Sequence, residues 1–333
     1  MAADEAVDSG ERSTLLPSEL LAFQQRSDAR GLLRLFGHLA AIAVSGTLYG
    51  VALTRSDSLL LHAALATLLG FTLVTMFAAM HESVHRTAFK TQWLNDGVGW
   101  FAGLLSFYNS TFYRPYHGWH HRYTQIPGQD PELEDRKPTN LLTYLIEISG
   151  VTWWLGKLRT HFRIALGKTD PYRFLTERTR PPVVRSVRLQ LGVYALASVL
   201  SVLLGYPYFA VYWLIPMVLG QPLLRIILLA EHTGCSETDN ALTNTRTTYT
   251  LPFVRFLMWE MPYHAEHHRY PALPFHSLAQ VHQRIGPALE HVARAGYSGF
   301  HGELLKSLTK HPASERRITA ISSGERGLMS KPS

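Results

Sequence analysis

The chain has 333 residues, of which 46% are hydrophobic and only 17% charged, and its formal net charge is +7. Low charge combined with long uncharged runs indicates a membrane protein with substantial polar parts. No basic patch interleaved with aromatic residues stands out, so we expect no nucleic-acid partner. The single cysteine, Cys235, excludes an internal disulfide framework, a Cys-rich zinc site and an iron–sulfur site.

The N-terminal segment, residues 1–34, is expected to be a disordered leader followed by an amphipathic stretch near the membrane surface. It carries several acidic residues and lacks an apolar core, so it is not a signal peptide. Two apolar runs follow, at 35–53 and 58–80, and each is long enough to cross ~30 Å of hydrocarbon as a helix. The short polar link between them requires a tight antiparallel pair.

The next segments favour the membrane interface. Residues 91–113 are apolar but broken by Gly and Asn, which indicates an interfacial helix or a half-buried hairpin. Residues 141–158 are amphipathic and contain two Trp, which is typical of an interface. Residues 159–188 are basic and contain proline, so we expect a cytoplasmic loop there.

Two more apolar runs, at 189–204 and 208–230, predict the third and fourth spans. Arg225 lies near the end of the fourth span, where an ionisable residue should face a partner or a polar cavity. An amphipathic helix is expected near 278–293. The membrane domain is predicted to cover 35–295, followed by a polar C-terminal tail, 296–333.

Charge asymmetry sets the expected orientation. Residues 81–187 hold fourteen Lys and Arg, whereas the two links between paired spans hold only Arg55. By the positive-inside rule both termini and the polar cap lie on the cytoplasmic side. The predicted fold is therefore all-α, with four transmembrane helices in two hairpins, interfacial helices and a cytoplasmic cap.

Three histidine runs stand out: HESVH at 81–85, HGWHH at 117–121 and HAEHH at 264–268. Residues i, i+3 and i+4 share a helix face, so each run presents its imidazoles in one direction. A random chain with this His content would hold only roughly 0.04 HxxHH patterns. Imidazole suits Zn, Cu, Fe or Ni, and eight such donors exceed what one four-coordinate ion needs. The pattern predicts a two-metal site.

The candidate metal ligands share these runs or lie at a matching depth. His232 is the ninth, because it ends the fourth span just as His81 follows the second. The predicted ligands are His81, His85, His117, His120, His121, His232, His264, His267 and His268.

Other residues beside the runs are candidates for supporting roles. A metal-bound His usually donates its second ring N–H to a carboxylate or carbonyl. The acidic candidates for this role are Glu82, Asp130, Glu132, Glu231 and Glu266. Asn244, Thr245 and Arg246 are expected to anchor a loop near the site or to bind a head group. The isolated histidines are interpreted as structural: His38, His62, His161, His276, His282, His291, His301 and His311.

The first run also matches HExxH, in which two His bind zinc and the Glu is the general base of a metalloprotease. That alternative needs a third protein ligand and leaves most of the later histidines without a role. A non-enzymatic binding module would not need two HxxHH runs.

The three runs, with HRYTQIPGQDPEL after the second and MPYHAEHHRYPALPFHSL around the third, resemble the integral-membrane fatty acid desaturase superfamily and especially its bacterial members. The resemblance covers roughly 35–290. It implies that the histidines bind two irons, activate dioxygen and remove two hydrogens from an acyl chain. Glu82 stands where many members have Asp. Hydroxylases and ketolases of lipids or carotenoids in the same superfamily are the alternative.

The resemblance also implies partners. The substrate would be an acyl-lipid, acyl-CoA or acyl-ACP, and the chain would lie in a bacterial inner membrane with its active site cytoplasmic. Reduction of dioxygen to water takes four electrons and the substrate supplies two, so an external donor must supply the rest. With no haem-binding domain and one cysteine, we expect a ferredoxin or cytochrome b5-type donor. Trp119, Tyr263 and Trp259 are candidates for lining an acyl channel.

Overall fold

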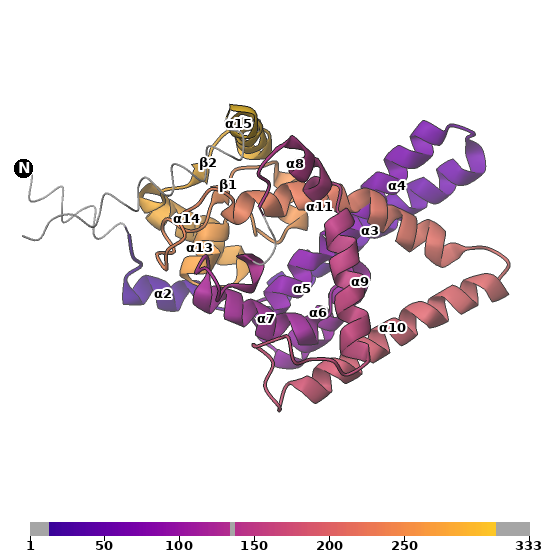
Figure 1. Ribbon diagram of the computed structural model, residues 1–333, viewed down its shortest axis with the longest axis horizontal. Coiled ribbons are helices and arrows are strands. Elements are labelled where there is room, and N and C mark those ends of the chain that lie inside the picture. Colours follow the sequence, from indigo (N-terminus) through magenta and orange to yellow (C-terminus); the bar gives the residue numbers. More distant parts are fainter. Residues whose placement is uncertain (1–12, 134–136, 311–333) are drawn as a thin grey trace, which may run out of the picture.

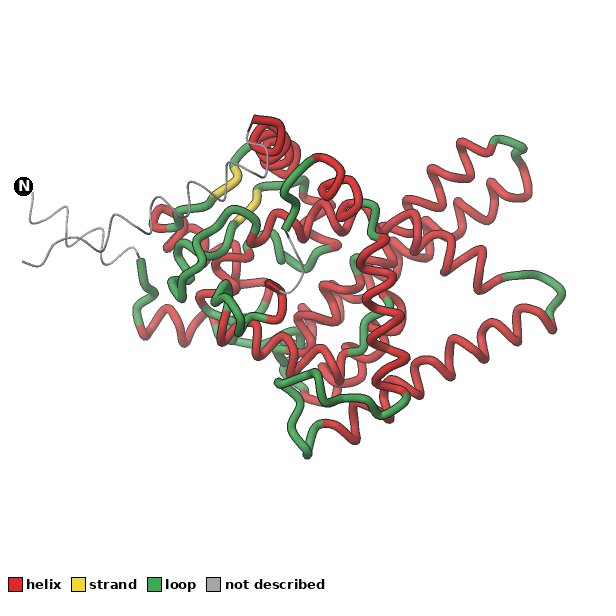
Figure 2. Tube along the Cα trace, in the orientation of Figure 1, coloured by secondary structure: helices red, strands yellow, loops and turns green. Residues whose placement is uncertain are grey.

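The computed structural model describes residues 13–133 and 137–310. Residues 1–12 of the predicted N-terminal segment and residues 311–333 of the predicted tail lie outside these ranges. Two long helical hairpins project side by side from a cap that is built of shorter helices (Figure 1). Helices and loops make up nearly all of the described chain (Figure 2).

Four helices of the described residues are long and apolar enough to cross a membrane. The first is α3, Asp28–Arg55, and the second combines α4, Leu59–Val74, with α5, Met76–Val84. The third is α10, Arg180–Leu203, and the fourth joins the π-helical turn η2, Ala210–Leu214, to α11, Ile215–His232. The predicted four spans in two hairpins are confirmed. The first and third helices begin several residues before their apolar runs, at Asp28 and Arg180. These first turns contain basic residues, and a search for apolar length does not count such turns as part of a span.

Backbone contact between α4 and α11 joins the two hairpins. An added Cβ on Gly70 would lie 1.9 Å from the carbonyl oxygen of Pro216, and one on Gly220 would lie 2.2 Å from the carbonyl carbon of Gly70. Small residues that let helix backbones touch are a common device in membrane bundles. This crossing brings the inner ends of the second and fourth spans together.

Shorter helices surround the inner ends of the spans. They are α2, Pro17–Phe23; α6, Gln92–Ser106; α7, Ser110–Tyr123; α8, Leu141–Ile148; and α9, Val151–Ala165. The sequence predicts one amphipathic segment over 141–158, but Gly150, at φ +76°, separates α8 from α9. Helix α9 also extends into the predicted basic loop.

Helix α9 runs across the hairpins rather than along them (Figure 1). Leu155, Phe162 and Leu166 on it are 65%, 58% and 69% exposed, and their spacing places them on one face. An exposed apolar stripe on a helix that crosses the spans is typical of a helix lying at a membrane interface.

The C-terminal part of the cap contains α12, Pro252–Leu257; α13, His264–Arg269; α14, Leu278–Ile285; and α15, Gly296–Lys310. Short 3-10 turns lie at Pro131–Leu133, Phe275–Ser277 and Gly286–Ala288. A two-residue parallel pairing joins β1, Thr247–Thr248, to β2, Val292–Ala293. The polar tail was predicted to begin at 296, but α15 occupies its first part and buries Phe300, His301 and Leu308. Its packing against the cap offsets the low helix propensity of its glycines.

Candidate metal centre

The first histidine run lies at the inner end of the second span. Every side chain of α5 is buried, including His81, and His85 is the residue that ends the helix. The rings of His81 and His85 have centroids 5.0 Å apart, as the i, i+4 spacing predicts. The predicted run therefore enters the cap directly from the membrane.

The other predicted ligands come from three further helices. The second run forms the last turn of α7, whose first turn is fixed by Asn109 accepting a hydrogen bond from Phe112 N. The third run forms most of α13, and His232 is the last residue of α11. Four helices far apart in sequence thus deliver their histidines to one place.

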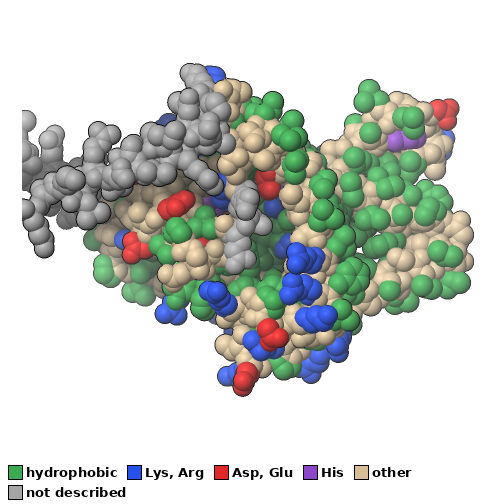
Figure 3. Space-filling view, in the orientation of Figure 1, with side chains coloured by type: hydrophobic (Ala, Val, Ile, Leu, Met, Phe, Trp, Pro, Cys, Tyr) green, Lys and Arg blue, Asp and Glu red, His purple; other side chains and the backbone are tan. Residues whose placement is uncertain are grey.

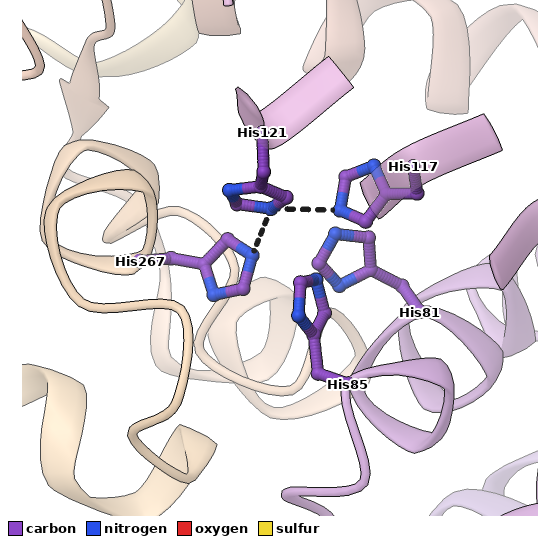
Figure 4. A group of neighbouring side chains, drawn as sticks. All are labelled: His81, His85, His117, His121 and His267. Atoms are coloured by element: carbon purple, nitrogen blue, oxygen red, sulfur yellow. Dashed lines mark hydrogen bonds between the residues drawn. The ribbon is translucent and has the colours of Figure 1, made fainter. Parts of the chain in front are cut away.

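Five imidazoles form the first group, and the members each place one ring nitrogen within 4.8 Å of one another. They are His81, His85, His117, His121 and His267 (Figure 4). Nε2 of His121 lies 3.0 Å from Nε2 of His117 and 3.0 Å from Nε2 of His267. Two nitrogens bound at right angles, each about 2.1 Å from one metal ion, are about 3.0 Å apart. The spacing fits ligands that share an ion.

The second group lies directly beside the first. His120, His232 and His268 are buried, and each places one ring nitrogen within 4.8 Å of the others. His264 joins them, with its Nε2 3.2 Å from Nε2 of His232. The rings of His121 and His268 stack with centroids 4.2 Å apart and connect the two groups. All nine predicted residues therefore lie together, as adjacent sets of five and four.

This donor set fits a transition metal. Nε2 of His85, Nε2 of His268 and both ring nitrogens of His81 are buried without a hydrogen-bond partner among the described residues. Burial lowers the pKa of His85 to about 3 and keeps the pKa of His121 and that of His267 well below the usual value. Neutral imidazoles whose lone pairs face one another in a dry interior are costly unless a cation accepts those lone pairs.

The outer ring nitrogens of several predicted ligands are held by neighbouring groups. Nδ1 of His120 lies 2.8 Å from Asp130 Oδ1, and Nδ1 of His232 lies 3.1 Å from the carbonyl oxygen of Asn244. Nδ1 of His117 lies 3.2 Å from the Tyr113 hydroxyl. Such contacts fix ring orientation and leave Nε2 for a metal. The predicted roles of Asp130 and of the loop at Asn244 agree with these contacts.

His120 differs from its neighbours in its electrostatics. Burial lowers its pKa, but the carboxylates of Glu132 and Asp130 outweigh burial and raise the pKa above the usual value. Asp130 Oδ2 also accepts a hydrogen bond from Gln125 N at 2.8 Å, and Oδ1 accepts one from Glu132 N at 2.9 Å. These hydrogen bonds, together with His120, lower the pKa of Asp130 against the opposing effect of burial.

The remaining acidic candidates divide into two kinds. Glu132 Oε2 lies 3.6 Å from His120 Nε2, and Glu231 Oε2 lies 3.5 Å from His264 Nε2, so both border the second group. Glu266 is fully buried and contacts Thr247 and His282 instead of a predicted ligand. Glu82 is also fully buried.

The hydrogen bond that Glu82 accepts comes from outside the histidine groups. Its Oε1 accepts a hydrogen bond from Phe275 N at 2.9 Å, and the residue does not line the cavity beside the histidines. The general base that an HExxH protease requires is therefore not directed at the site.

A cavity of about 150 Å³ lies beside the histidines. His81, His117, His120, His232 and His264 line one side of it. Four apolar side chains, Phe77, Leu228, Leu229 and Met261, also line it. The rest of the lining is aromatic or charged: Tyr108, Tyr113, Tyr116, Trp153, Glu132, Lys137, Glu147, Lys157, Arg225 and Glu231. The cavity has the mixed lining expected of a site for an apolar chain that is held next to polar groups.

The predicted channel aromatics are only partly placed as expected. Trp259 is fully buried, its Nε1 donates to His38 Nδ1 at 3.3 Å, and it packs in the core rather than along the cavity. Its prediction was wrong, because a hydrogen-bonded Trp in a closed core leaves no room for a ligand. Trp119 lines a groove next to the cavity, whereas Tyr263 packs against His282.

Two other residues singled out by sequence have structural environments. Arg246 donates to the carbonyl oxygens of Ala230 and Thr233 and so secures the end of α11. Cys235 is half-buried, and burial raises the pKa of its thiol to about 11.

Several residues around the site were not predicted from sequence. Tyr113 precedes His117 by four residues, so helical spacing could have identified it. Thr124 contacts His268 Nδ1 at 3.2 Å, and Gln125 Nε2 donates to the carbonyl oxygen of His232 at 2.7 Å. Both residues lie in the phrase HRYTQIPGQDPEL that follows the second run, but nothing in that phrase predicts which of its side chains contact the later histidines. His282 was interpreted as isolated, but it contacts Glu266 within the third run.

Most other isolated histidines lie away from the two groups. His38, for example, contacts the carbonyl oxygen of Thr72 at 2.9 Å, and His301 contacts Tyr144 and the carbonyl oxygen of Ile226. His311 lies outside the described residues.

Comparison with known proteins agrees with this site. The chain matches the model of the family described as fatty acid desaturase over residues 58–299. It is 25% identical over 275 residues to the sn-1 oleoyl-lipid 12-desaturase of Arthrospira platensis, with 76% of each chain covered. It is 26% identical over 269 residues to the sn-1 oleoyl-lipid 12-desaturase of a Picosynechococcus species, with 73% of this chain and 74% of that protein covered.

The matched region contains all three histidine runs, His232 and three of the four spans in full. It thus includes every residue of both imidazole groups. A family match over most of the chain and a buried polyhistidine site at the inner ends of its spans lead to one conclusion: the chain belongs to the fatty acid desaturase family and is an oxidoreductase.

Proposed function

We propose that the protein is a dioxygen-dependent acyl-lipid desaturase whose nine clustered histidines hold two iron ions. The observation that carries the proposal is the convergence of nine mostly buried imidazoles, in sets of five and four, beside a partly apolar cavity that five of them line. Imidazole donors suit iron, and two adjacent sets suit two ions. The product would be an acyl chain with a new C=C bond.

Each set would hold one ion through its inner nitrogens. Bound iron would supply the reduction of dioxygen and the oxidising power needed to break unactivated C–H bonds. The chain itself supplies position: Asp130, Tyr113 and the Asn244 carbonyl hold three imidazoles in fixed orientations. A rigid outer layer of this kind keeps the donor atoms in place when charge changes at the metals.

The cavity would position the substrate. Phe77, Leu228 and Met261 form the apolar wall of a cavity that imidazoles of both groups also line. An acyl chain against this wall would exclude water and present one pair of carbons to the metals, which is the orientation that desaturation requires. Because two relatives are named for an oleoyl-lipid, we favour a lipid-linked acyl chain over acyl-CoA or acyl-ACP.

The proposal also includes the source of the electrons for dioxygen reduction and the orientation of the protein in the membrane. Desaturation coupled to reduction of dioxygen to water requires two electrons from outside, and a ferredoxin or cytochrome b5-type protein would deliver them. The site lies at the end of the spans where the basic loops gather, so it faces the cytoplasm under the positive-inside rule. A bacterial inner membrane fits this arrangement.

Expression in a lipid-producing bacterium tests the proposal. Metal analysis of the purified protein should give about two irons per chain, and mass spectrometry should find lipid acyl chains lighter by two hydrogens. A product heavier by one oxygen would instead indicate the hydroxylase alternative, and one that gained an oxygen and lost two hydrogens would indicate the ketolase alternative. One zinc per chain with no lipid product would contradict the proposal. His120→Ala and His267→Ala should each abolish the product, because each removes a donor from a different set.

A further inference from the structure

A groove of about 1130 Å³ runs between α7 and α9 and adjoins the cavity beside the histidines. Five basic residues line it: Lys157, Arg159, Arg163, Arg173 and Arg225. Glu147 is the one acidic residue among the described residues that line it. Lys and Arg side chains gather along α9 at the edge of a hollow in the surface (Figure 3). The groove is therefore strongly cationic.

The outer part of the groove has basic groups available to a ligand. Arg159, Arg163 and Arg173 form no ion pair within the part of the chain that the structure describes. Two of them, Arg159 and Arg163, lie on one helix and can be reached by a single head group. An anion placed here would gain charge-assisted hydrogen bonds without breaking an existing ion pair.

The inner end of the groove points toward the histidines. Lys157 lies over the Tyr108 ring at 3.8 Å, and Arg225 donates to the Tyr108 hydroxyl at 3.2 Å. Nε of Arg225 is buried without a hydrogen-bond partner among the described residues. A buried guanidinium N–H that lacks an acceptor indicates a place for an external oxygen.

The groove and the cavity share part of their lining. Tyr113, Tyr116, Trp153, Lys157 and Arg225 border both. A ligand whose charged end lies between Arg159 and Arg173 can thus pass an apolar tail along these aromatic rings into the cavity. The cationic groove matches the charged head of an amphiphile, and the apolar part of the cavity matches its tail.

The groove also lies at the level of lipid head groups. Helix α9 exposes Leu155, Phe162 and, at its C-terminal end, Leu166, which places this helix at the membrane interface. Arg159 and Arg163 lie within one helical turn of these apolar side chains, so their guanidinium groups lie where the phosphates of the inner leaflet are found. An acyl lipid can reach the groove without leaving the membrane surface completely.

We propose that this groove binds the phosphate-bearing head group of the acyl substrate, and that the protein selects acyl chains linked to an anionic rather than a neutral head group. The inference rests on the proposed function, since it names the substrate of the same cavity. Phospholipid and acyl-CoA share the required chemistry, and neutral glycolipid does not. Arg159, Arg163 and Arg173 hold the phosphate, while Lys157 and Arg225 guide the chain past Tyr108.

Binding measured without turnover tests the proposal independently of the oxidase chemistry. The full chain in detergent is titrated with four probes: saturated lysophosphatidylglycerol, palmitoyl-CoA, neutral monopalmitoylglycerol and inorganic phosphate. We expect one or both anionic acyl probes to bind at least tenfold more tightly than the neutral one. The tighter of the two identifies the head group. Equal binding of the neutral probe, or phosphate binding as tightly as the acyl probes, would overturn the proposal.

A matched pair of triple variants separates the groove from general charge attraction. Arg159→Gln, Arg163→Gln and Arg173→Gln together should weaken the anionic probes about tenfold and leave the neutral probe unchanged. The control removes the same charge outside the groove: Lys168→Gln, Arg178→Gln and Arg185→Gln. It should change binding less than twofold. Equal losses in both triples would show that only the overall charge matters and would refute a site.

Activity then gives a second readout. In the iron-loaded enzyme the groove triple should raise KM for the anionic lipid and leave kcat within twofold, because it removes binding far from the reacting carbons. Intact probe binding in a protein that makes no desaturated product would refute the proposed function alone. Normal desaturation with unchanged KM in the groove triple would refute the groove alone.

Discussion

His120 Nδ1 and Asp130 Oδ1 lie 2.8 Å apart, and both side chains are almost completely buried. Asp130 is itself fixed by two backbone N–H groups, from Gln125 and Glu132. The carboxylate therefore locks the ring of one proposed ligand through a rigid turn. Among the acidic residues near the runs, it alone makes a short contact with the outer nitrogen of a proposed ligand within the described chain.

Asp130→Asn should weaken the second metal set. The amide keeps the size of the side chain but removes the negative charge and places an N–H group where an acceptor is required. Loss of such an outer partner typically costs 10–100-fold in metal affinity. Iron retained after dialysis against a chelator measures the effect. Asp170→Asn, at an exposed ion pair with Arg180, is the control and should retain wild-type iron.

The spans and the histidine runs could be predicted because both are local patterns. Apolar length identifies a span, and the spacing of His117, His120 and His121 identifies a shared helix face. Even His232 could be placed, since its depth follows from the end of a span. These features need no knowledge of what packs against them.

The partners of the ligands could not be predicted, because they depend on turns and packing. Five acidic residues were equivalent candidates in sequence, yet Glu82 turns to the Phe275 amide whereas Asp130 reaches His120. Helix α15 contains glycines with low helix propensity, and it is stable because Phe300 and Leu308 are buried against the cap. Tertiary contacts therefore determine both the hydrogen-bond partners of the acidic residues and the formation of α15.

His282→Leu should loosen the third histidine run. His282 Nδ1 contacts Glu266, whose other oxygen accepts a hydrogen bond from Thr247, so one buried carboxylate ties α13 to both α14 and β1. Leucine removes the contact and leaves a buried carboxylate partly unpaired, which costs about 1–3 kcal/mol or more. We expect faster loss of iron to a chelator and a lower Tm.

Two variants on the same helix control this result. His282→Gln retains an N–H group that can donate to Glu266 and should recover most of the iron retention. Gln283→Leu makes a similar apolar change at an exposed neighbour and should have little effect. If His282→Gln lost iron as fast as His282→Leu, the hydrogen bond to Glu266 would not position the run.

Gly70→Ala should disturb the site from within the membrane. Its new methyl group would lie 1.9 Å from the carbonyl oxygen of Pro216, so α4 and α11 must move apart. These helices lead to His81 and His232, one in each metal set. Overpacking of this kind costs about 1–3 kcal/mol and should lower both Tm and iron content. Gly192→Ala, which meets nothing within 4 Å, should leave both unchanged or slightly raise Tm.

Cysteine labelling tests the proposed orientation. In a Cys235→Ser background, Asp57→Cys places a thiol in the link between α3 and α4, and Glu177→Cys places one on the basic side between α9 and α10. A membrane-impermeant maleimide applied to intact bacteria should label Asp57→Cys alone. After the cells are broken, both should react. Labelling of Glu177→Cys in intact cells would place the histidine site outside the cytoplasm.

Acid should destabilise the protein partly through His161, which is buried and stacks on Phe107 at 4.7 Å between ring centroids. Burial lowers its pKa from 6.5 to about 4. Below pH 6.5 the unfolded chain protonates His161, whereas the folded chain keeps it neutral. The contribution of neutral His161 to the free energy of unfolding is therefore fully present above about pH 6.5 and is lost as the pH drops to about 4. A difference of this size is worth at most about 3 kcal/mol. His161→Phe removes this titration, so the gap in Tm between wild type and variant should narrow or reverse from pH 7 to pH 5. A gap that stays constant would mean that His161 titrates normally in the folded protein.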